Sequence, residues 1–433
     1  MISHKGKSIK LILIVLLYVF VSGDAEVRCI ESEREALLSF KNGLIDEYDV
    51  LSSWQSKECC KWHGVECSST TGHVTTLQLS GLDHDGVLKG DVRSSLLELH
   101  HLNRLDLSLN DFGGIPIPEF IGSMKQLQHL SLSGSKFAGS IPPQLGNLTN
   151  LHSLDLSYNS LSSTSLSILA PVFESLEILD LSYNQLNGCI PDPSAFSSLK
   201  ELHLLKNNFT GSIPSSIGQL SELQVLDLSY NSLEGLVSES HFSKLDKLKT
   251  LDLSFNALIL DTAPDWSPPF QLESISLGGC DVGPYFPKWI QTQRNLYSLD
   301  LRRANITDEA PRWLWSTLSL LTNLDLSDNR ISGAIPNLSS TSIRYMVLSN
   351  NQFSGPIPLF STVASDIQLS GNMLSGSILS ICKTSNEHLR TLVLSNNQLS
   401  GEVPNCWENT PNLQSLDLLT TVFRVKFLAL WAT

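Results

Sequence analysis

The chain has 433 residues, 41% of them hydrophobic and 17% charged, so it can fold but is long for a single globular core. Its formal net charge is −14, and its 29 basic residues are scattered along the chain. Binding to nucleic acid requires clustered Lys and Arg, so we expect no nucleic-acid partner. A soluble acidic surface explains the charge more simply.

The N-terminus has the pattern of a secretory signal peptide. Basic residues between His4 and Lys10 precede an apolar run over 11–21, and small residues follow up to Ala25. The run is shorter than the about 20 residues that cross a bilayer, and we expect no membrane span elsewhere in the chain. We therefore predict a signal peptide at 1–25 and a mature chain on the extracellular face.

Cysteine content and glycosylation sequons agree with that compartment. Eight cysteines suit an oxidising environment. Four Asn-x-Ser/Thr sequons, each a possible glycan site, stand at Asn147, Asn208, Asn305 and Asn337.

A six-residue pattern, L-x-L-x-x-N, recurs through most of the sequence. "LDLSYN" ends at Asn159, Asn184 and Asn231, and "LDLSFN" ends at Asn256. Fifteen copies follow one another with a period of about 24 residues, which is typical of leucine-rich repeats. Their closing positions are Leu82, Asn110, Ser135, Asn159, Asn184, Asn207, Asn231, Asn256, Cys280, Ala304, Asn329, Asn351, Asn372, Asn397 and Thr421.

Each copy is predicted to form one coil of a solenoid. The leucines of L-x-L would point inward from a short strand, and stacked strands would form a parallel sheet. The asparagine amide can satisfy backbone groups that the following turn would leave unpaired. Cys280 can replace it as a small buried side chain with a weak S–H donor, whereas Ser135, Ala304 and Thr421 should be weaker.

The second half of each repeat is also patterned. "GSIP" begins at Gly139 and Gly211, and close variants begin at Gly188, Gly333 and Gly355. Glycine permits a tight bend, and proline suits a strand whose N–H side is free. We predict a second short strand on this outer flank and little helix.

These repeats resemble those of the plant extracellular leucine-rich-repeat family. The segments "LHSLDLSYNSLS" and "FTGSIPSSIGQLSELQVLDLSYNSL" match the family consensus closely. The resemblance implies an α/β solenoid, a right-handed superhelix with a concave parallel β-sheet and a plant-type second strand. It assigns residues 77–421 to the repeats.

The segment at 26–76 resembles the cysteine-paired N-terminal cap of that family. The resemblance implies disulfides between Cys29 and Cys59 and between Cys60 and Cys67. An apolar set suits a helix that covers the open end of the first coil, namely Ala36, Leu37, Leu38, Phe40 and Leu44.

The phrase "GPYFPKWIQTQ" is similar to receptor-like proteins of the disease-resistance type, including the group that recognises fungal xylanase. The resemblance implies extracellular ligand recognition at the plasma membrane and signalling through partner receptor kinases. Residues 422–433 depart from the family: they form a short apolar tail without a C-terminal cap. We therefore expect a truncated product, located in the apoplast in this form, whose last coil would expose leucine-lined surface.

If the chain has a binding site, we expect it on the concave face. Stacked coils would align the residues just before the asparagines, and departures from the consensus add three further positions. The candidate residues are Tyr158, Tyr183, His203, Lys206, Tyr230, Phe255, Arg302 and Arg303. The aromatic row is also ordinary repeat spelling, so a scaffold role is the simpler interpretation. Arg302 and Arg303, beside Gly278 and Gly279, could seat an acidic or glycan ligand, or could reflect a tolerant surface.

Trp266, Trp289 and Trp313 each follow a proline by two residues and would stack on an outer flank, with Trp315 nearby. Packing is the favoured interpretation of this stripe, and an interface is the alternative. Cys382 and Cys406 occupy similar places one repeat apart, which predicts a disulfide. Cys189 and Cys280 are expected to be unpaired.

The sequence shows no P-loop, kinase motif, H-E-x-x-H or G-x-S-x-G, so we expect no enzyme, cofactor or metal site. The favoured hypothesis is a receptor-like protein that binds a protein, peptide or glycan from a pathogen or the cell wall and acts with co-receptor kinases. The alternative is a soluble inhibitor of a wall-degrading enzyme, similar to polygalacturonase-inhibiting proteins.

Overall fold

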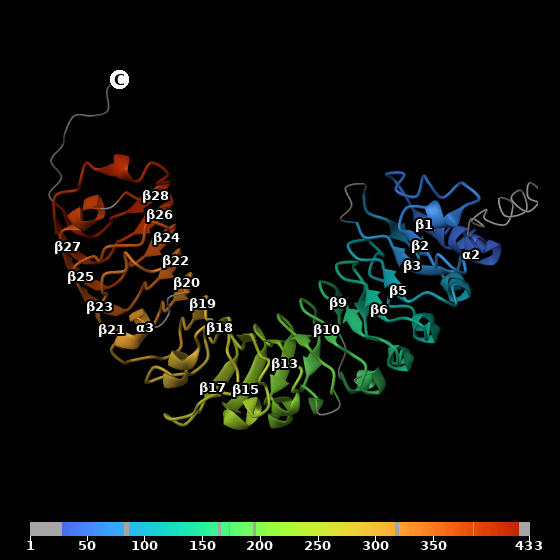
Figure 1. The fold of residues 1–433 in the computed structure, drawn as a ribbon, viewed down its shortest axis with the longest axis horizontal. Coiled ribbons are helices and arrows are strands. Elements are labelled where there is room, and N and C mark those ends of the chain that lie inside the picture. The colour runs from blue at the N-terminus through green and yellow to red at the C-terminus, as the bar shows by residue number, and fades with distance from the viewer. Residues whose placement is uncertain are drawn as a thin grey trace, which may run out of the picture.

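A computed structural model describes residues 28–81, 86–162, 166–172, 174–193, 196–316, 320–383 and 385–423. The expected signal peptide, the repeat position Leu82 and most of the expected tail lie outside these residues. The coils form a wide open arc with the first and last described coils at opposite tips (Figure 1). The predicted solenoid is confirmed.

One sheet of 16 strands lines the inner side of the arc. Its first pair, β2–β3, is antiparallel, and every later pair is parallel with aligned apolar residues at the central position, as in Leu154, Leu179 and Leu202. The strands in order are β2 (Val65–Cys67), β3 (Val74–Gln78), β5 (Arg104–Asp106), β6 (His129–Ser131), β8 (Ser153–Asp155), β10 (Ile178–Asp180), β12 (Glu201–His203), β14 (Val225–Asp227), β16 (Thr250–Asp252), β18 (Ser274–Ser276), β19 (Ser298–Asp300), β20 (Asn323–Asp325), β22 (Tyr345–Val347), β24 (Asp366–Gln368), β26 (Thr391–Val393) and β28 (Ser415–Asp417).

Short second strands run along the flank, as the G-x-I-P pattern predicted. They form three parallel groups: β7 (Ala138–Gly139) with β9 (Ser160–Leu161); β11 (Asn187–Gly188), β13 (Asn208–Gly211), β15 (Ser232–Val237) and β17 (Ala257–Leu260); and β21 (Ser332–Ala334), β23 (Gln352–Gly355), β25 (Met373–Gly376), β27 (Gln398–Gly401) and β29 (Val422–Phe423). No flank strand is assigned in the described coils between β17 and β21, where isolated bridges join Ile259 to Asp281 and Glu309 to Ser332.

Helix content is low in the described chain, as predicted. The α-helices are α2 (Glu31–Lys41) and α3 (Arg312–Ser316). Single 3-10 turns close the outer side of many coils: Cys59–Lys61, Ser94–Glu98, Glu119–Ser123, Pro143–Asn147, Leu166–Val172, Ser215–Gln219, Glu239–Phe242, Lys288–Thr292, Ile378–Lys383 and Trp407–Asn409.

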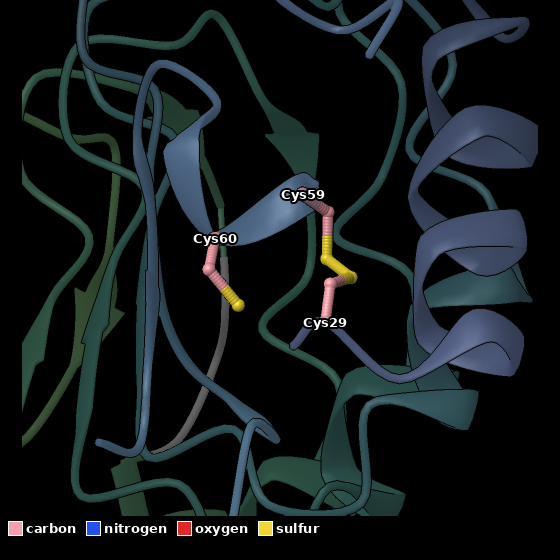
Figure 2. Close-up of side chains that lie close together, drawn as sticks. All are labelled: Cys29, Cys59 and Cys60. Carbon is pink, nitrogen blue, oxygen red and sulfur yellow. A yellow bond between two sulfur atoms is a disulfide. The ribbon is translucent and has the colours of Figure 1, made fainter. Parts of the chain in front are cut away.

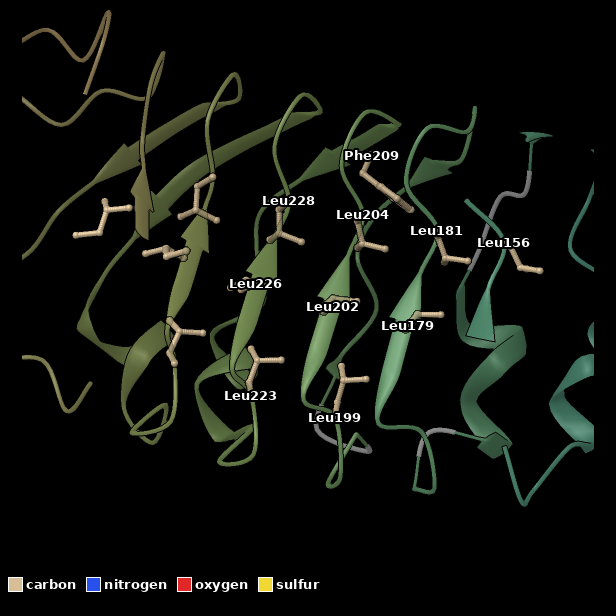
Figure 3. Packing of buried hydrophobic residues seen from close by; sticks show 14 of the residues in the cluster. Leu156, Leu179, Leu181, Leu199, Leu202, Leu204, Phe209, Leu223, Leu226 and Leu228 are labelled. Atoms are coloured by element: carbon tan, nitrogen blue, oxygen red, sulfur yellow. The ribbon is translucent and has the colours of Figure 1, made fainter. Parts of the chain in front are cut away.

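The core is a continuous column of aliphatic side chains between the main sheet and the outer turns. Leu179 and Leu181 alternate along β10 and its exit with outward residues, and both are fully buried. Figure 3 shows the equivalent leucines of neighbouring coils, together with Phe209, pointing into the same interior. Burying one such side chain stabilises the fold by about 2 kcal/mol, which explains why the pattern is retained in every coil.

The asparagines form the predicted ladder of hydrogen bonds between coils. The Nδ2 group of Asn184 donates to the carbonyl oxygen of Leu156 in the preceding coil at 2.9 Å, and to those of Leu181 and Ser182 in its own coil. Its Oδ1 atom accepts from the backbone N–H of Leu161 at 2.9 Å. Each amide thus satisfies backbone groups of two coils at once.

The substituted positions of the ladder are weaker in different ways. The Ser135 hydroxyl still donates to the preceding coil, to the carbonyl oxygen of Leu107 at 2.7 Å. The Thr421 hydroxyl donates within its own coil, to Leu418, and Ala304 has no polar group to offer. Cys280 keeps the cross-coil bond through its thiol, as predicted: Sγ lies 3.2 Å from the carbonyl oxygen of Leu253.

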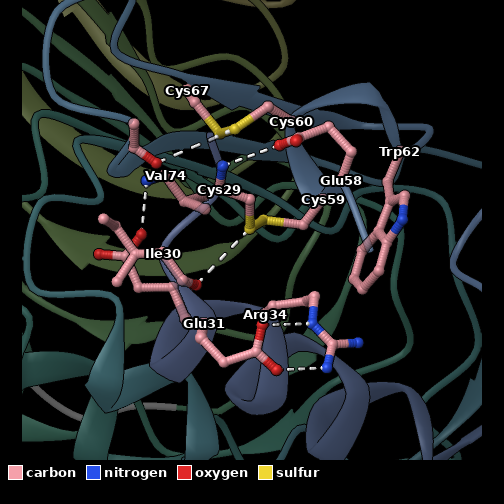
Figure 4. Close-up of a disulfide and its surroundings, with 12 residues drawn as sticks. Cys29, Ile30, Glu31, Arg34, Glu58, Cys59, Cys60, Trp62, Cys67 and Val74 are labelled. Carbon is pink, nitrogen blue, oxygen red and sulfur yellow. Dashed lines mark hydrogen bonds and ion pairs between the residues drawn. A yellow bond between two sulfur atoms is a disulfide. The ribbon is translucent and has the colours of Figure 1, made fainter. Parts of the chain in front are cut away.

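Two disulfides and one helix close the N-terminal end (Figure 4). Cys29 pairs with Cys59 and Cys60 with Cys67, as the family resemblance implied. Helix α2 buries Ala36, Leu37 and Phe40 against the first coil, whereas Leu38 is only partly buried.

Leu44 was expected in the capping helix, and this is wrong. The helix ends at Lys41, and Leu44 lies in β1 (Leu44–Ile45), which pairs with β4 (Lys89–Gly90). Gly43 and Gly90 permit the close approach of these two segments, since the backbone N–H of Asp91 donates to the carbonyl oxygen of Gly43. The apolar periodicity continued past the helix because Leu44 is partly buried against the core from this strand, whereas Ile45 is exposed.

Candidate functional site

The aromatic and basic residues before the asparagines form a row along one edge of the main sheet. We call Tyr158, Tyr183, Lys206, Tyr230 and Phe255 the rim row. Tyr158 lies three residues beyond the end of β8, so the row follows the exits of the strands instead of lying on the strands themselves. The sequence had placed these side chains on the concave strand face.

The rings of the rim row stack on one another. The ring centroids of Tyr158 and Tyr183 are 4.1 Å apart, and those of Tyr230 and Phe255 are 4.4 Å apart. The Lys206 ammonium lies 4.9 Å from the Tyr183 centroid, a cation–π distance. Because these contacts cover ring faces, the row presents mainly ring edges and hydroxyl groups to a partner.

All five rim residues adopt the left-handed backbone conformation, with φ between 51° and 55°. The same turn elsewhere carries Gly134, Gly279 and Gly371, which reach positive φ without strain. The letters of the rim residues do not indicate this conformation, although a glycine that recurs at the position before the asparagine could have indicated it.

Arg302 and Arg303 were expected to form a cationic spot, and the structure neutralises both. The Arg302 Nε atom lies 3.0 Å from an Asp300 carboxylate oxygen, and Arg303 Nε lies at the same distance from Asp328. Arg302 also fills the space above Gly278, where an added Cβ atom would meet its Cγ at 2.9 Å. The spot free of side chains is therefore covered.

His203 lies on the concave face at the end of β12. In register it is flanked by Asp180 and Asp227, and its Nε2 atom lies 3.3 Å from a Glu201 carboxylate oxygen. His203 thus interrupts a stripe of aspartates that runs across the sheet.

That aspartate stripe is a structural motif that the sequence analysis missed. The backbone N–H and the hydroxyl of Ser157 both donate to one carboxylate oxygen of Asp155, at 3.0 and 2.7 Å. The same Asp-x-Ser arrangement recurs at Asp252 and Asp325. Burial raises the pKa of the Asp155 and Asp252 carboxyls, and it raises the pKa of Asp300 to about 6. The recurring "LDLS" was the available signal.

The tryptophans of the outer flank pack, as the favoured interpretation stated. Trp289 is buried, and its ring meets that of Trp266 edge-on at 5.6 Å. Trp266 also packs against Phe242 and Phe270, while Trp313 meets Phe286. This aromatic cluster joins neighbouring coils on the outer side.

The cysteines follow the predicted pairing. Cys382 and Cys406 form a disulfide with Cα atoms 5.6 Å apart, whereas Cys189 is exposed and unpaired and Cys280 is buried and unpaired. Cys29, Cys59 and Cys60 lie close enough together to suggest a metal site (Figure 2). All three sulfurs are already in disulfides, so they have no thiolate to offer a metal.

A second cluster, which the sequence did not suggest, joins Glu33, His73 and His101. The buried carboxylate of Glu33 accepts from the backbone N–H of Val74 at 2.7 Å and lies 2.8 Å from His73 Nδ1. The His73 and His101 rings stack at 3.8 Å. Glu33 thereby fastens the capping helix to β3, which is a structural role.

The four sequons lie away from the strands of the main sheet. Asn147 ends a 3-10 turn on the outer side, and Asn208 begins flank strand β13. Asn305 and Asn337 are in segments without regular secondary structure, and all four asparagines are exposed. Glycans at these positions would leave the inner face of the arc open.

The inner face contains two polar hollows. One, of about 350 Å³, lies over β5 to β10 and includes Arg104, His129, His152 and Glu177. The other, of about 460 Å³, lies over β22 to β28 and includes Arg344, Tyr345 and Arg390. Neither contains the candidate residues chosen from the sequence.

Comparison with known proteins identifies the family. A model described as "Leucine-rich repeat region" matches residues 88–354, and one described as "Leucine rich repeat N-terminal domain" matches residues 30–68. The chain belongs to the leucine-rich-repeat family. This leucine-rich-repeat protein also matches a single-repeat model, "Leucine Rich Repeat", at residues 388–410.

Its similar relatives include plant receptor-like proteins. It is 32% identical to Receptor-like protein EIX2 of Solanum lycopersicum over 90% of this chain and 61% of the relative. It is also 32% identical to Receptor-like protein EIX1 of the same plant, over 81% of this chain and 57% of the relative. This leucine-rich-repeat protein therefore spans about three fifths of the length of these relatives.

Solved structures agree on the architecture. The structure titled PEPR1-AtPEP1 matches with a TM-score of 0.68 and 29% identity, covering 91% of this chain and 56% of that one. A TDR receptor structure matches with a TM-score of 0.67 and 25% identity, covering 80% and 64% of the two chains. Within the described residues, no helix is long and apolar enough to cross a membrane.

Proposed function

We propose that this leucine-rich-repeat protein is the ligand-recognition region of an extracellular plant receptor-like protein that perceives pathogens and signals through partner receptor kinases. The observation that carries the proposal is the inner sheet: it extends through 16 strands, bears varied polar side chains, and has no sequon on any of its strands. The similarity to receptor-like proteins and to receptor structures supports the same role.

Three disulfides, an expected signal peptide and four exposed sequons favour passage through the secretory pathway. An extended curved surface suits the binding of a protein or peptide across several coils, because each coil contributes only a few side chains. We place the site on the concave sheet, with the rim row at its edge.

A glycan introduced on the concave sheet tests this proposal. Ser274→Asn on β18 creates a sequon with Ser276, and His129→Asn on β6 creates one with Ser131. The matched control is Gln219→Asn, which creates a sequon with Ser221 at the end of an outer 3-10 turn. Asn147 naturally occupies the corresponding place in its coil.

The full chain would be secreted from plant cells and assayed for binding to fungal xylanase and for co-precipitation with receptor kinases. We expect each of the two concave sequons to abolish xylanase binding and kinase co-precipitation. The outer sequon should leave these two activities unchanged. Equal activity of all three variants would contradict the proposal. Inhibition of a wall hydrolase without kinase association would instead support the inhibitor hypothesis.

A further inference from the structure

The residue that immediately precedes each inner strand forms a second row across the concave face. We call this the entry row; from β8 onward it runs through His152, Glu177, Lys200, Gln224, Lys249, Glu273, Tyr297, Thr322, Arg344, Ser365, Arg390 and Gln414. The aligned register of the strands places these residues side by side in neighbouring coils.

Charges in the first part of the entry row neutralise one another. Lys200 Nζ lies 2.7 Å from a Glu177 carboxylate oxygen, and Lys249 Nζ lies 3.8 Å from one of Glu273. From Tyr297 onward the row contains two arginines and no acid. Arg344 and Arg390 are both exposed, and neither forms an ion pair with a residue that the structure describes.

These two arginines stand on either side of Ser365 in the 460 Å³ hollow. Strands are about 4.8 Å apart, so the Cα atoms of Arg344 and Arg390 are separated by about 10 Å. Two extended guanidinium groups can reach one carboxylate from that separation, and arginine binds carboxylates with paired hydrogen bonds.

The acidic side chains nearest to these two arginines form no ion pair with them. Asp366 accepts a hydrogen bond from the Ser365 hydroxyl at 2.7 Å, and Glu387 lies on the wall of the hollow beside His388. His388 Nδ1 is 3.1 Å from the carbonyl oxygen of Thr362. The hollow thus presents two cations and a separate carboxylate, together with the exposed side chain of Tyr345 on β22.

We propose that this hollow binds a peptide segment that carries a carboxylate and a neighbouring basic group. The carboxylate lies between Arg344 and Arg390, and the basic group pairs with Glu387. A polyuronate is disfavoured, because its repeated carboxylates would meet Glu387 and Asp366. This inference rests on the proposed recognition function and names the ligand class for one part of the concave face.

Fluorescence anisotropy with the full chain tests the assignment. The probe is a fluorescein-labelled octapeptide with two glutamates and one lysine, and the comparison probe replaces all three with glutamine. The main variant combines Arg344→Gln with Arg390→Gln. The matched control is Arg294→Gln, an exposed arginine just after the outer 3-10 turn Lys288–Thr292, which also forms no ion pair with a described residue.

We expect the charged probe to bind the wild type at least about 10-fold more tightly than the glutamine probe, and the double variant to lose that preference. The control should change affinity by less than about 2-fold. Arg390→Lys keeps the charge but not the paired hydrogen-bond geometry, so its affinity for the charged probe should fall about 3-fold. This conservative variant keeps the test valid if the double variant fails to fold. Glu387→Gln should weaken the charged probe and strengthen a lysine-free probe.

Three results would overturn the proposal. One is equal binding of the two probes, and another is an equal loss of affinity in Arg294→Gln and in the double variant. The third is competition by an oligogalacturonide octamer that exceeds competition by the unlabelled peptide. If any of these occurs while the concave sequons still block xylanase binding, the ligand class is wrong and the recognition function stands.

Discussion

The thiol of Cys280 lies 3.2 Å from the carbonyl oxygen of Leu253, where an asparagine amide stands in most other coils. The cysteine thus preserves one bond of the ladder and loses those that an amide would add. Burial raises the pKa of the Cys280 thiol to about 12, so the group stays protonated and continues to donate. The contact shows how strongly the position selects for a buried donor.

This burial predicts the reactivity of the two unpaired cysteines. In the native protein at pH 8, we expect iodoacetamide to modify the exposed Cys189 and to leave Cys280 unmodified. Peptide mapping by mass spectrometry measures both. After unfolding without a reductant, only these two thiols should titrate with Ellman reagent. A free thiol at Cys382 or Cys406 would contradict the observed disulfide.

Removal of one ladder amide should destabilise the chain strongly. Asn256→Ala leaves the carbonyl oxygen of Leu228 and the N–H of Leu233 without their partner, at a cost of about 3 kcal/mol. The control, Asn150→Ala, removes an exposed amide that bonds to Lys125 and should cost less than about 1 kcal/mol. Urea unfolding followed by circular dichroism measures both. Similar midpoints for the two variants would refute the role of the ladder.

The left-handed rim turn predicts an unusual order of substitutions at Tyr230. Its φ of 51° strains any residue with a Cβ atom, so Tyr230→Gly should be about 1 kcal/mol more stable than Tyr230→Ala. Both variants lose the stacking with Phe255, which cancels in the comparison. The difference in urea midpoint is the measurement. An alanine variant as stable as the glycine variant would show that the turn relaxes.

Asp300 predicts a pH dependence of stability. Burial raises its folded pKa to about 6 from an ordinary value of 3.8, so the folded state binds a proton more tightly than the unfolded chain. Its contribution therefore favours folding below pH 4 and is lost as pH rises through 6. Relative to Asp300→Asn, the wild type should lose on the order of 2 kcal/mol between pH 4 and pH 7.

Thermal unfolding of both proteins at several pH values measures this difference. Asp328 serves as an internal contrast, because hydrogen bonding from Asn350 and Arg303 lowers its pKa. Asp328→Asn should therefore change the pH profile in the opposite direction. Parallel profiles for the wild type and Asp300→Asn would exclude a raised pKa at Asp300.

Much of the fold could be predicted because one repeat encodes one coil. Leu179 and Leu181 indicate the strand and the core of one coil, and Asn184 indicates its turn. The equivalent residues of neighbouring coils support the same assignment. The cysteine pairs followed from the family cap and from the spacing of Cys382 and Cys406. The prediction for Leu44 was wrong because an apolar residue after a helix can pack partly against the core from a short strand.

The candidate site was less accessible to sequence reasoning. The direction of the Tyr158 side chain depends on a left-handed backbone conformation that cannot be inferred from the residue type. The charge of Arg302 appeared free because one partner, Asp325, lies on the neighbouring strand, and because the sequence does not show that the Arg302 side chain turns back toward Asp300, two residues before it. Arg344 and Arg390, in contrast, are ordinary in their own repeats, and their lack of partners emerges only when neighbouring coils are stacked.

The flank strands and the row of ladder asparagines are interrupted in the same coils. Between β17 and β21 the second sheet is reduced to isolated bridges, and the two ladder positions there are Cys280 and Ala304. Two adjoining coils are thus joined mainly by the inner strands and by packing of Trp266 and Trp289. Bending of the arc under load should concentrate at this joint, which would change the separation of its two arms while each arm keeps its shape.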